Sequence, residues 1–308
     1  MSGSRQARRW LAAGAAGATA AGAARFAYAA AGRRPPGGPK LWVRTNHRGE
    51  PVTLLEGPAV AVGAIAGVLV QRLVFPRPAG SASGRAIAAL AIGGAGAAVF
   101  GAYDDLAGSG DRRGFRGHLG ALRHGEVTTG AVKLGGIGVT GIVSAALASG
   151  SPADVVVNAG LVAGGANLLN LFDLRPGRAI KVAALSGALL GAAGRESVAA
   201  PLGAALALLP EDLGERAMLG DAGANALGAM LGAAAAGLPR AARIALLAGI
   251  AGLTAASEKV SFTKVIERTP ALHRLDMLGR PRGVRGDGSP REEEQGGSGG
   301  DRSPETTG

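Results

Sequence analysis

The chain has 308 residues, of which 47% are hydrophobic, 18% are charged and only 3% are aromatic. A soluble core of this size normally draws on more Phe, Tyr and Trp, so the composition argues against a soluble globular protein. Cysteine is absent, which excludes disulfides and thiolate metal sites. The net charge of +11 is dispersed between apolar runs without aromatic stacking platforms, so we expect no nucleic-acid partner.

Long apolar segments recur along the whole chain. A helix needs about 20 mostly apolar residues to cross the hydrocarbon core. The sequence therefore predicts an all-α, polytopic transmembrane helical bundle of about nine or ten spans. The candidate spans are 10–32, 58–75, 85–103, 131–150, 153–172, 180–194, 197–210, 222–238 and 241–257.

Two parts of this pattern leave alternatives open. The first span carries Arg25 and follows a basic start, so it is either a retained helix or a signal peptide. The spans at 180–194 and 197–210 are short, and we expect them to be tilted or re-entrant, returning the chain to the same side. The 54 glycines suit close packing of membrane helices, although GC-rich coding bias also raises their number.

The spans divide the chain into an N-terminal transmembrane helix at 1–32, a multi-span domain at 33–282 and a tail at 283–308. The tail is rich in Gly, Ser, Glu and Pro, and we expect it to be disordered and cytoplasmic. Lys and Arg number 20 at one set of alternate junctions and nine at the other. By the positive-inside rule the first set is cytoplasmic and the N-terminus is outside, although the basic N-terminus argues locally for the reverse.

The first candidate site is the acidic pair Asp104-Asp105, at the C-terminal end of a predicted span. The helix macrodipole disfavours carboxylates there, so ordinary capping does not explain them. One interpretation is a solvated loop start paired with Arg112 and Arg113. The other is Mg²⁺, a hard ion that takes oxygen ligands and usually keeps waters and substrate phosphates.

A second candidate precedes the next span, where Thr128 and Thr129 are followed by Lys133. Free N–H groups and hydroxyls at a helix start bind anions, and Lys133 adds a point charge for phosphate. The alternative is an N-cap followed by a lysine that snorkels to the interface. The sequence Gly136-Ile-Gly138-Val-Thr-Gly141 matches a dinucleotide pattern, but without a preceding strand it predicts helix packing only.

Three further polar positions lie near the predicted cytoplasmic end. Asn167 and Asn170 share one helical face and precede Asp173, and polar amides in a span are costly unless they pair or meet a ligand. Hydrogen bonding between helices is the alternative for the asparagines, and an ion pair of Asp173 with Arg175 or Arg178 is the alternative for the acid.

The three remaining candidate residues lie at the start of a span and after the final span. Asp221 lies where a span begins, so metal binding and an N-cap are both consistent with it. His273 and Arg274 follow the last span, and a lone histidine is usually structural.

These motifs share one side of the predicted bundle. Asp104, Asp105, Asp173 and Asp221 come from three different helix ends that face one compartment, together with Lys133. Like charges beside a low-dielectric slab repel unless a cation joins them. The pattern therefore indicates a Mg²⁺–phosphate site at the membrane surface, which aqueous phosphates reach from one side and a lipid from between the helices.

In this order the motifs resemble those of the polyprenyl-phosphate N-acetylhexosamine-1-phosphate transferase family. The resemblance covers roughly residues 40–280, and it rests on Asp104-Asp105, Thr128-Thr129-Gly130 with Lys133, Asn167-x-x-Asn170-x-x-Asp173 and Gly220-Asp221-x-Gly223. It implies a Mg²⁺-dependent enzyme of a bacterial plasma (inner) membrane, with its active face in the cytoplasm. Such enzymes transfer a phospho-sugar from a UDP-sugar to polyprenyl phosphate and release UMP in cell-envelope glycan synthesis, which makes 33–282 the phospho-sugar transferase domain.

The resemblance also implies roles for individual residues. Asp221 would bind Mg²⁺, with Asp105 as a second ligand, while Asp104 and Asp105 would position or deprotonate the lipid phosphate. Lys133 would face the phosphates. The remaining substrate-side residues would be Thr128, Thr129, Asn167, Asn170, Asp173, His273 and Arg274. A homodimer is one arrangement that the sequence leaves open.

Three departures from the family pattern bear on nucleotide and sugar recognition. The Asp-Gly-x-Asp-Gly motif becomes Asp173-Leu-Arg-Pro176-Gly177, so its second acid is lost. The histidine-rich final loop is reduced to His273, and Glu211 replaces an expected Asn. An active phospho-sugar transferase is the leading hypothesis. The alternatives are a non-catalytic relative that binds lipid phosphate or scaffolds envelope assembly, and a transporter.

Overall fold

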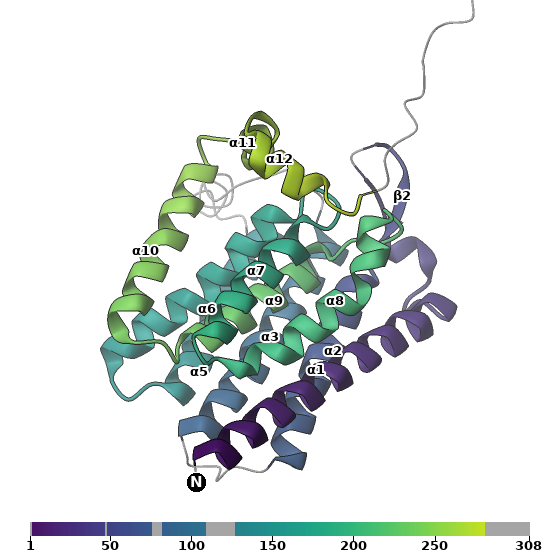
Figure 1. The fold of residues 1–308 in the computed structure, drawn as a ribbon. Helices are drawn as coiled ribbons and strands as arrows, with labels where there is room; N and C mark the ends of the chain where they lie inside the picture. Colours follow the sequence, from purple (N-terminus) through teal and green to yellow (C-terminus); the bar gives the residue numbers. More distant parts are fainter. Residues whose placement is uncertain (1, 47, 76–81, 109–126, 281–308) are drawn as a thin grey trace, which may run out of the picture.

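The computed structural model describes residues 2–46, 48–75, 82–108 and 127–280 (Figure 1). The predicted tail at 283–308, and Arg112 and Arg113, lie outside this part of the chain. Within it the chain is almost entirely helical, which confirms the predicted all-α helical bundle. The nine long helices described are α1 (Ser2–Arg33), α2 (Glu56–Val74), α3 (Ala82–Ala107), α5 (Thr129–Ala148), α6 (Pro152–Phe172), α7 (Arg178–Ala192), α8 (Ala199–Leu213), α9 (Gly220–Ala235) and α10 (Arg240–Ser257).

Each of these helices coincides with one predicted span. Five of them are long and apolar enough to cross a membrane, namely α2, α3, α5, α6 and α10. The helices α7, α8 and α9 have 15, 15 and 16 residues. At 1.5 Å per residue they are shorter than a hydrocarbon core of about 30 Å. A short 3-10 helix, Glu196–Val198, joins α7 to α8, and Gly177 before α7 packs on Leu213 at the end of α8, so this pair returns the chain to the same end as predicted.

The first helix is part of the bundle and packs along α2 and α8. Its single charged residue within the predicted span, Arg25, donates a hydrogen bond from Nη1 to the carbonyl oxygen of Ala207 at 2.6 Å. A backbone carbonyl on the neighbouring helix is therefore the polar partner of this charge. The helix α1 is not among the five that are long and apolar enough to cross a membrane, so the predicted N-terminal transmembrane helix stays a prediction.

The helix α9 forms the centre of the molecule, where all of its residues except Asp221 are buried. It contacts α2, α3, α5, α6, α7 and α8 (Figure 1). Against α6 the two backbones touch: a Cβ atom at Gly228 would lie 2.2 Å from the carbonyl oxygen of Gly165, and one at Gly232 would lie 2.1 Å from that of Leu161. Glycine is therefore required at this contact, as in other close-packed membrane helices.

The glycine pattern of α5 also serves packing, as the sequence predicted. A Cβ atom at Gly136 would lie 2.3 Å from the ring of Phe100 on α3, and one at Gly141 would lie 3.0 Å from the carbonyl oxygen of Ala159 on α6. The third glycine of the pattern, Gly138, has nothing within 4 Å. These are contacts between helices, and they give the pattern a structural role.

Replacing Gly228 with alanine tests the central contact. We expect Gly228→Ala to lower the free energy of unfolding by about 3 kcal/mol, because the added methyl group forces two backbones apart. The matched control, Gly138→Ala, adds the same group in open space, and alanine is favoured over glycine inside a helix by about 0.5–1 kcal/mol. Thermal unfolding of the full chain in detergent measures both, and equal midpoints would contradict this packing.

One end of the bundle, termed the site end, is where α3 and α6 finish and α5 and α9 begin. It carries a hairpin of β1 (Val43–Thr45) and β2 (Pro51–Thr53), together with the short helices α11 (Phe262–Arg268) and α12 (Pro270–Met277) (Figure 1). The N-terminus of α1 lies at the other end, termed the opposite end (Figure 1).

Candidate functional site

Lys133 is the centre of a polar cluster at the site end. It lies one turn into α5, and its ammonium group forms an ion pair with Asp104 at 2.6 Å and a second one with Asp221. The three side chains are only 16%, 16% and 21% exposed. The structure therefore does not show Lys133 snorkelling to the interface, which was one alternative for this residue. The cation instead joins carboxylates from α3 and α9.

The start of α5 is arranged around this lysine. Thr128 is the N-cap of α5, and its hydroxyl accepts a hydrogen bond from the amide of Ala131 at 3.1 Å. The side chain of Thr129 lies within hydrogen-bonding reach of Asp104. The N-cap predicted as one alternative is thus present, and the cluster around Lys133 exists beside it.

Asp105 has a different role from its neighbour. Its two carboxylate oxygens accept hydrogen bonds from the backbone amides of Asp221 at 3.0 Å and Ala222 at 2.8 Å. Because the first amides of a helix have no partners within the helix, Asp105 of α3 caps α9 from outside. The guanidinium of Arg44 on the hairpin also donates to the carbonyl oxygen of Asp105. Asp221 itself is not the N-cap, which is Leu219.

Glycines allow this capping contact to form. Gly220, at φ +58°, has the left-handed conformation that favours glycine, and a Cβ atom there would lie 3.0 Å from Asp105 Oδ2. A Cβ atom at Gly101 would lie 2.3 Å from the carbonyl oxygen of Asp221. The predicted Gly-Asp motif thus brings the end of α3 onto the beginning of α9.

A second group of acids lies deeper at the same end. Asp173 follows α6, and its Oδ2 atom is buried without a hydrogen-bond partner among the described residues. Burial, followed by the charges of Asp212 and Asp105, raises the pKa of Asp173 well above its ordinary value. Asp212 on α8 and Glu56 at the start of α2 are also buried and carry unpartnered oxygens.

Asp173 and Asp212 line a pocket of about 190 Å³, together with Thr45, Asn46, Val52, Leu174, Arg175, Pro176, Glu215, Ala217 and Met218. Unpartnered carboxylate oxygens accept hydrogen bonds and attract cations, so this pocket suits hydroxyl, N–H or cationic groups. Glu56 and Asp212 were not predicted as site residues. The only available signal was an acid at each predicted span boundary, which also fits a solvated helix end.

The final segment is fixed to the site end by a buried ion-pair cluster. Arg178 donates to Asp276 from Nε at 2.8 Å and from Nη2 at 3.0 Å, and Arg280 donates to Asp276 at 2.9 Å. Arg280 also donates to the carbonyl oxygen of Pro176 at 3.0 Å. Arg178 therefore does not pair with Asp173, which was one alternative for that acid, and Arg175 lies 3.6 Å from Glu267 instead.

Four predicted site residues lie on helices that reach the site end, α6 and α12, and do not join the cluster. Asn167 and Asn170 are half-buried on α6, and neither side chain makes a hydrogen bond within the described part of the chain. His273 and Arg274 are exposed on α12, and their side chains make no contact of this kind with described residues either. Their roles toward a substrate remain predictions.

The donor set is compatible with Mg²⁺, although no group of three or more His, Asp or Glu side chains that could hold a metal ion occurs in the described residues. Asp104 and Asp221 face one cation, the Lys133 ammonium group, and Mg²⁺ commonly uses one or two carboxylates with waters and substrate phosphates. The geometry favours Asp104 beside Asp221 for this purpose. The predicted ligand Asp105 has both oxygens engaged with backbone amides.

The fold and this cluster define a polytopic helical membrane protein with a lysine–carboxylate cluster at one end of its bundle. Comparison with protein-family models found no match, and comparison with curated proteins found none either.

Proposed function

We propose that the chain is a membrane phosphotransferase that moves a phospho-N-acetylhexosamine from a UDP-sugar to polyprenyl phosphate and releases UMP. The observation that carries this proposal is the cluster of Lys133, Asp104 and Asp221, which joins three helices at one end of an apolar bundle. A water-soluble phosphate donor and a membrane-embedded phosphate acceptor can meet only at such an end.

In the proposed reaction an oxygen of polyprenyl phosphate attacks the β-phosphorus of the UDP-sugar. The bond between that phosphorus and the bridging oxygen breaks, and the electron pair leaves with UMP. Lys133 binds phosphate oxygens and offsets their charge, because its ammonium group is the cation of the cluster. The hydroxyls of Thr128 and Thr129 at the start of α5 add hydrogen-bond donors for the same oxygens.

Mg²⁺ fits this site with Asp221 and Asp104 as its protein ligands. When bound, it would neutralise charge on the transferred phosphoryl group. Asp105 holds the beginning of α9, and thereby Asp221, in place through two backbone hydrogen bonds. The acidic pocket at Asp173 and Asp212 would accept hydroxyl and N–H donors of the sugar nucleotide, which agrees with the role that the family resemblance implies for Asp173.

The protein would be a multi-pass component of a bacterial plasma membrane, with the site end in the cytoplasm, where nucleotide sugars are made. The excess of Lys and Arg at the junctions of that end supports this orientation. A homodimer is compatible with it.

Transfer of label from a panel of UDP-sugars to undecaprenyl phosphate, by purified full-length protein with Mg²⁺, tests the proposal. We expect Asp221→Asn to lower the rate about 10³-fold, because charge stabilisation of the transferred group is lost. Asp154→Asn is the matched control, since Asp154 pairs with Arg243 at the opposite end. Absence of transfer across the panel by folded wild-type protein would refute the proposal.

A second candidate function is a non-catalytic relative that binds lipid phosphate or scaffolds envelope assembly. The observation that favours it is that His273 and Arg274, the remnant of the family's final loop, are exposed and without partners among the described residues. Complementation of a deletion strain distinguishes the two. Restoration of growth by Asp221→Asn would favour the non-catalytic function, and failure to restore growth would favour catalysis.

A further inference from the structure

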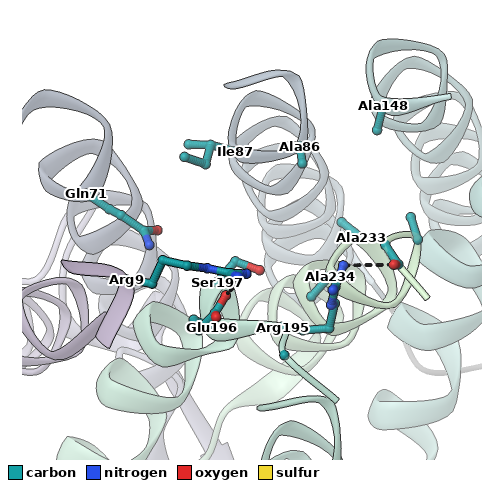
Figure 2. A pocket seen from close by; sticks show the side chains of 13 residues that line it. Arg9, Gln71, Ala86, Ile87, Ala148, Arg195, Glu196, Ser197, Ala233 and Ala234 are labelled. Atoms are coloured by element: carbon teal, nitrogen blue, oxygen red, sulfur yellow. Dashed lines mark hydrogen bonds and ion pairs between the residues drawn. The ribbon is translucent and has the colours of Figure 1, made fainter. Parts of the chain in front are cut away.

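A second cavity lies at the opposite end of the bundle, away from the proposed transfer site. It has a volume of about 390 Å³ and is built from the ends of five helices (α1, α2, α3, α5 and α9) and from the segment that links α7 to α8. This volume is within the range of small-molecule sites. Its polar lining consists of Arg9, Gln71, Arg195, Glu196 and Ser197 (Figure 2).

The charges that line this cavity do not cancel. Arg9 is paired with Glu196 at 2.9 Å. Arg195 donates to the carbonyl oxygen of Gly237 at 2.8 Å, and it forms no ion pair with a carboxylate of the described chain. Its Nε atom is buried and has no hydrogen-bond partner there. The lining thus carries one uncompensated positive charge and a free donor, which together favour an anion.

Gln71 also needs a hydrogen-bond donor, which a simple anion does not provide. Its side chain belongs to α2 and is 4% exposed, and its Oε1 atom has no hydrogen-bond partner among the described residues. A buried acceptor without a donor is costly. The remaining walls near it, such as Ala86 and Ile87 of α3, offer no side-chain donor. In Figure 2, Gln71 and Arg9 lie on one side of the cavity and Arg195 on the other, with Glu196 and Ser197 between them.

We propose that this cavity binds the phosphoglycerol headgroup of an anionic phospholipid. The phosphate would bind to Arg195 and to the free edge of Arg9, and a glycerol hydroxyl would donate to Gln71 Oε1. The end of a membrane bundle lies at headgroup depth, so lipid headgroups reach this cavity. A choline headgroup has no donor for Gln71, and an ethanolamine headgroup would bring an ammonium group beside two arginines.

The experiment measures which lipid stays with the full chain. The protein is purified from an equimolar mixture of phosphatidylglycerol, phosphatidylethanolamine and phosphatidylcholine, and retained lipids are quantified by mass spectrometry. We expect enrichment of phosphatidylglycerol in the wild type and a loss of about tenfold in Arg195→Gln, since a charge-assisted contact disappears. Arg240→Gln, which removes an exposed arginine outside the cavity at the same end, should retain the enrichment.

A second variant, Gln71→Leu, distinguishes headgroup binding in the cavity from a merely structural role of Arg195. Phosphatidic acid, which has no glycerol hydroxyl, is added to the mixture for this variant. We expect the variant to lose phosphatidylglycerol while its retention of phosphatidic acid is the same as that of the wild type. Displacement of the lipid by soluble glycerol phosphate would also support the site. Equal retention of all lipids by the wild type, or binding of soluble glycerol phosphate without lipid enrichment, would overturn the proposal. The readout is independent of transfer activity, so its failure leaves the proposed function untouched.

Discussion

Replacing Lys133 with methionine should lower the free energy of unfolding by about 3 kcal/mol and abolish transfer. The side chain is largely buried, and its removal leaves Asp104 and Asp221 facing each other without the cation that joins them. Breaking a buried ion pair from one side costs about 3–5 kcal/mol, because the remaining charge is uncompensated. The thermal unfolding midpoint of the full chain in detergent measures this loss. Lys259→Met, at an exposed lysine beyond α10, should leave the midpoint unchanged.

A second substitution and the addition of Mg²⁺ test whether the loss of stability comes from the cluster. Adding Asp221→Asn to Lys133→Met should restore more than half of the lost stability, because the repulsion is removed. Adding Mg²⁺ should stabilise Lys133→Met more than it stabilises the wild type, since the ion would meet two carboxylates without a competing ammonium group. Identical behaviour of the single and double variants, with no response to Mg²⁺, would show that these carboxylates do not form one cluster.

The second large effect is expected at Asp276. This carboxylate accepts three hydrogen bonds from Arg178 and Arg280. The side chains of Arg178 and Asp276 are both at most 5% exposed. We expect Asp276→Asn to weaken docking of α12 by about 3 kcal/mol. Faster proteolysis within residues 258–280 is the measurement, because local release of one segment need not unfold the bundle. Glu267→Gln, which breaks a long and half-exposed pair with Arg175, should change the cleavage rate little.

The same carboxylate makes docking dependent on pH. Burial alone would raise the pKa of Asp276, but the hydrogen bonds and charge of Arg178, followed by the charges of Arg280 and Lys181, outweigh burial and lower this pKa below its ordinary value. A lowered pKa contributes stability above the unfolded value, and this stability is lost as the pH falls through the folded value. Protection of α12 should therefore be full at neutral pH and decrease below about pH 4. Protection unchanged down to pH 2 would contradict this arrangement.

The helices could be predicted because apolar length is a local property of the sequence. Nine predicted spans became nine helices, although α1, α7, α8 and α9 are not among the five that are long and apolar enough to cross a membrane. The hairpin at 43–53 was not predicted. Its strands have three residues each, and its turn depends on Asn46, whose side chain accepts hydrogen bonds from the amides of Arg48 and Glu50. So short a segment carries no periodic signal.

The site was predicted only in part, for a related reason. Spacing placed Asp104, Lys133 and Asp221 at one end, and the structure brings them into contact. Spacing could not predict that Asp104 and Asp105 have different roles, because Asp105 becomes a helix cap only where α9 packs against it. For the same reason, spacing left an ion pair of Arg178 with Asp173 open as an alternative, and the structure shows Asp276 as the partner instead. Asp276 lies 98 residues away, and no local rule favours it over Asp173.

The measurement that tests the proposed function most directly is the fate of the β-phosphorus in a labelled UDP-sugar. Purified full-length protein would be incubated with Mg²⁺, undecaprenyl phosphate and UDP-sugars that carry the label at that phosphorus. We predict that the label appears in the lipid product and that UMP is released in equal amount, with both signals absent in Asp221→Asn. Label that leaves as UDP, or that never enters the lipid with any sugar of the panel, would contradict the assignment of Lys133, Asp104 and Asp221 as a phospho-sugar transfer site.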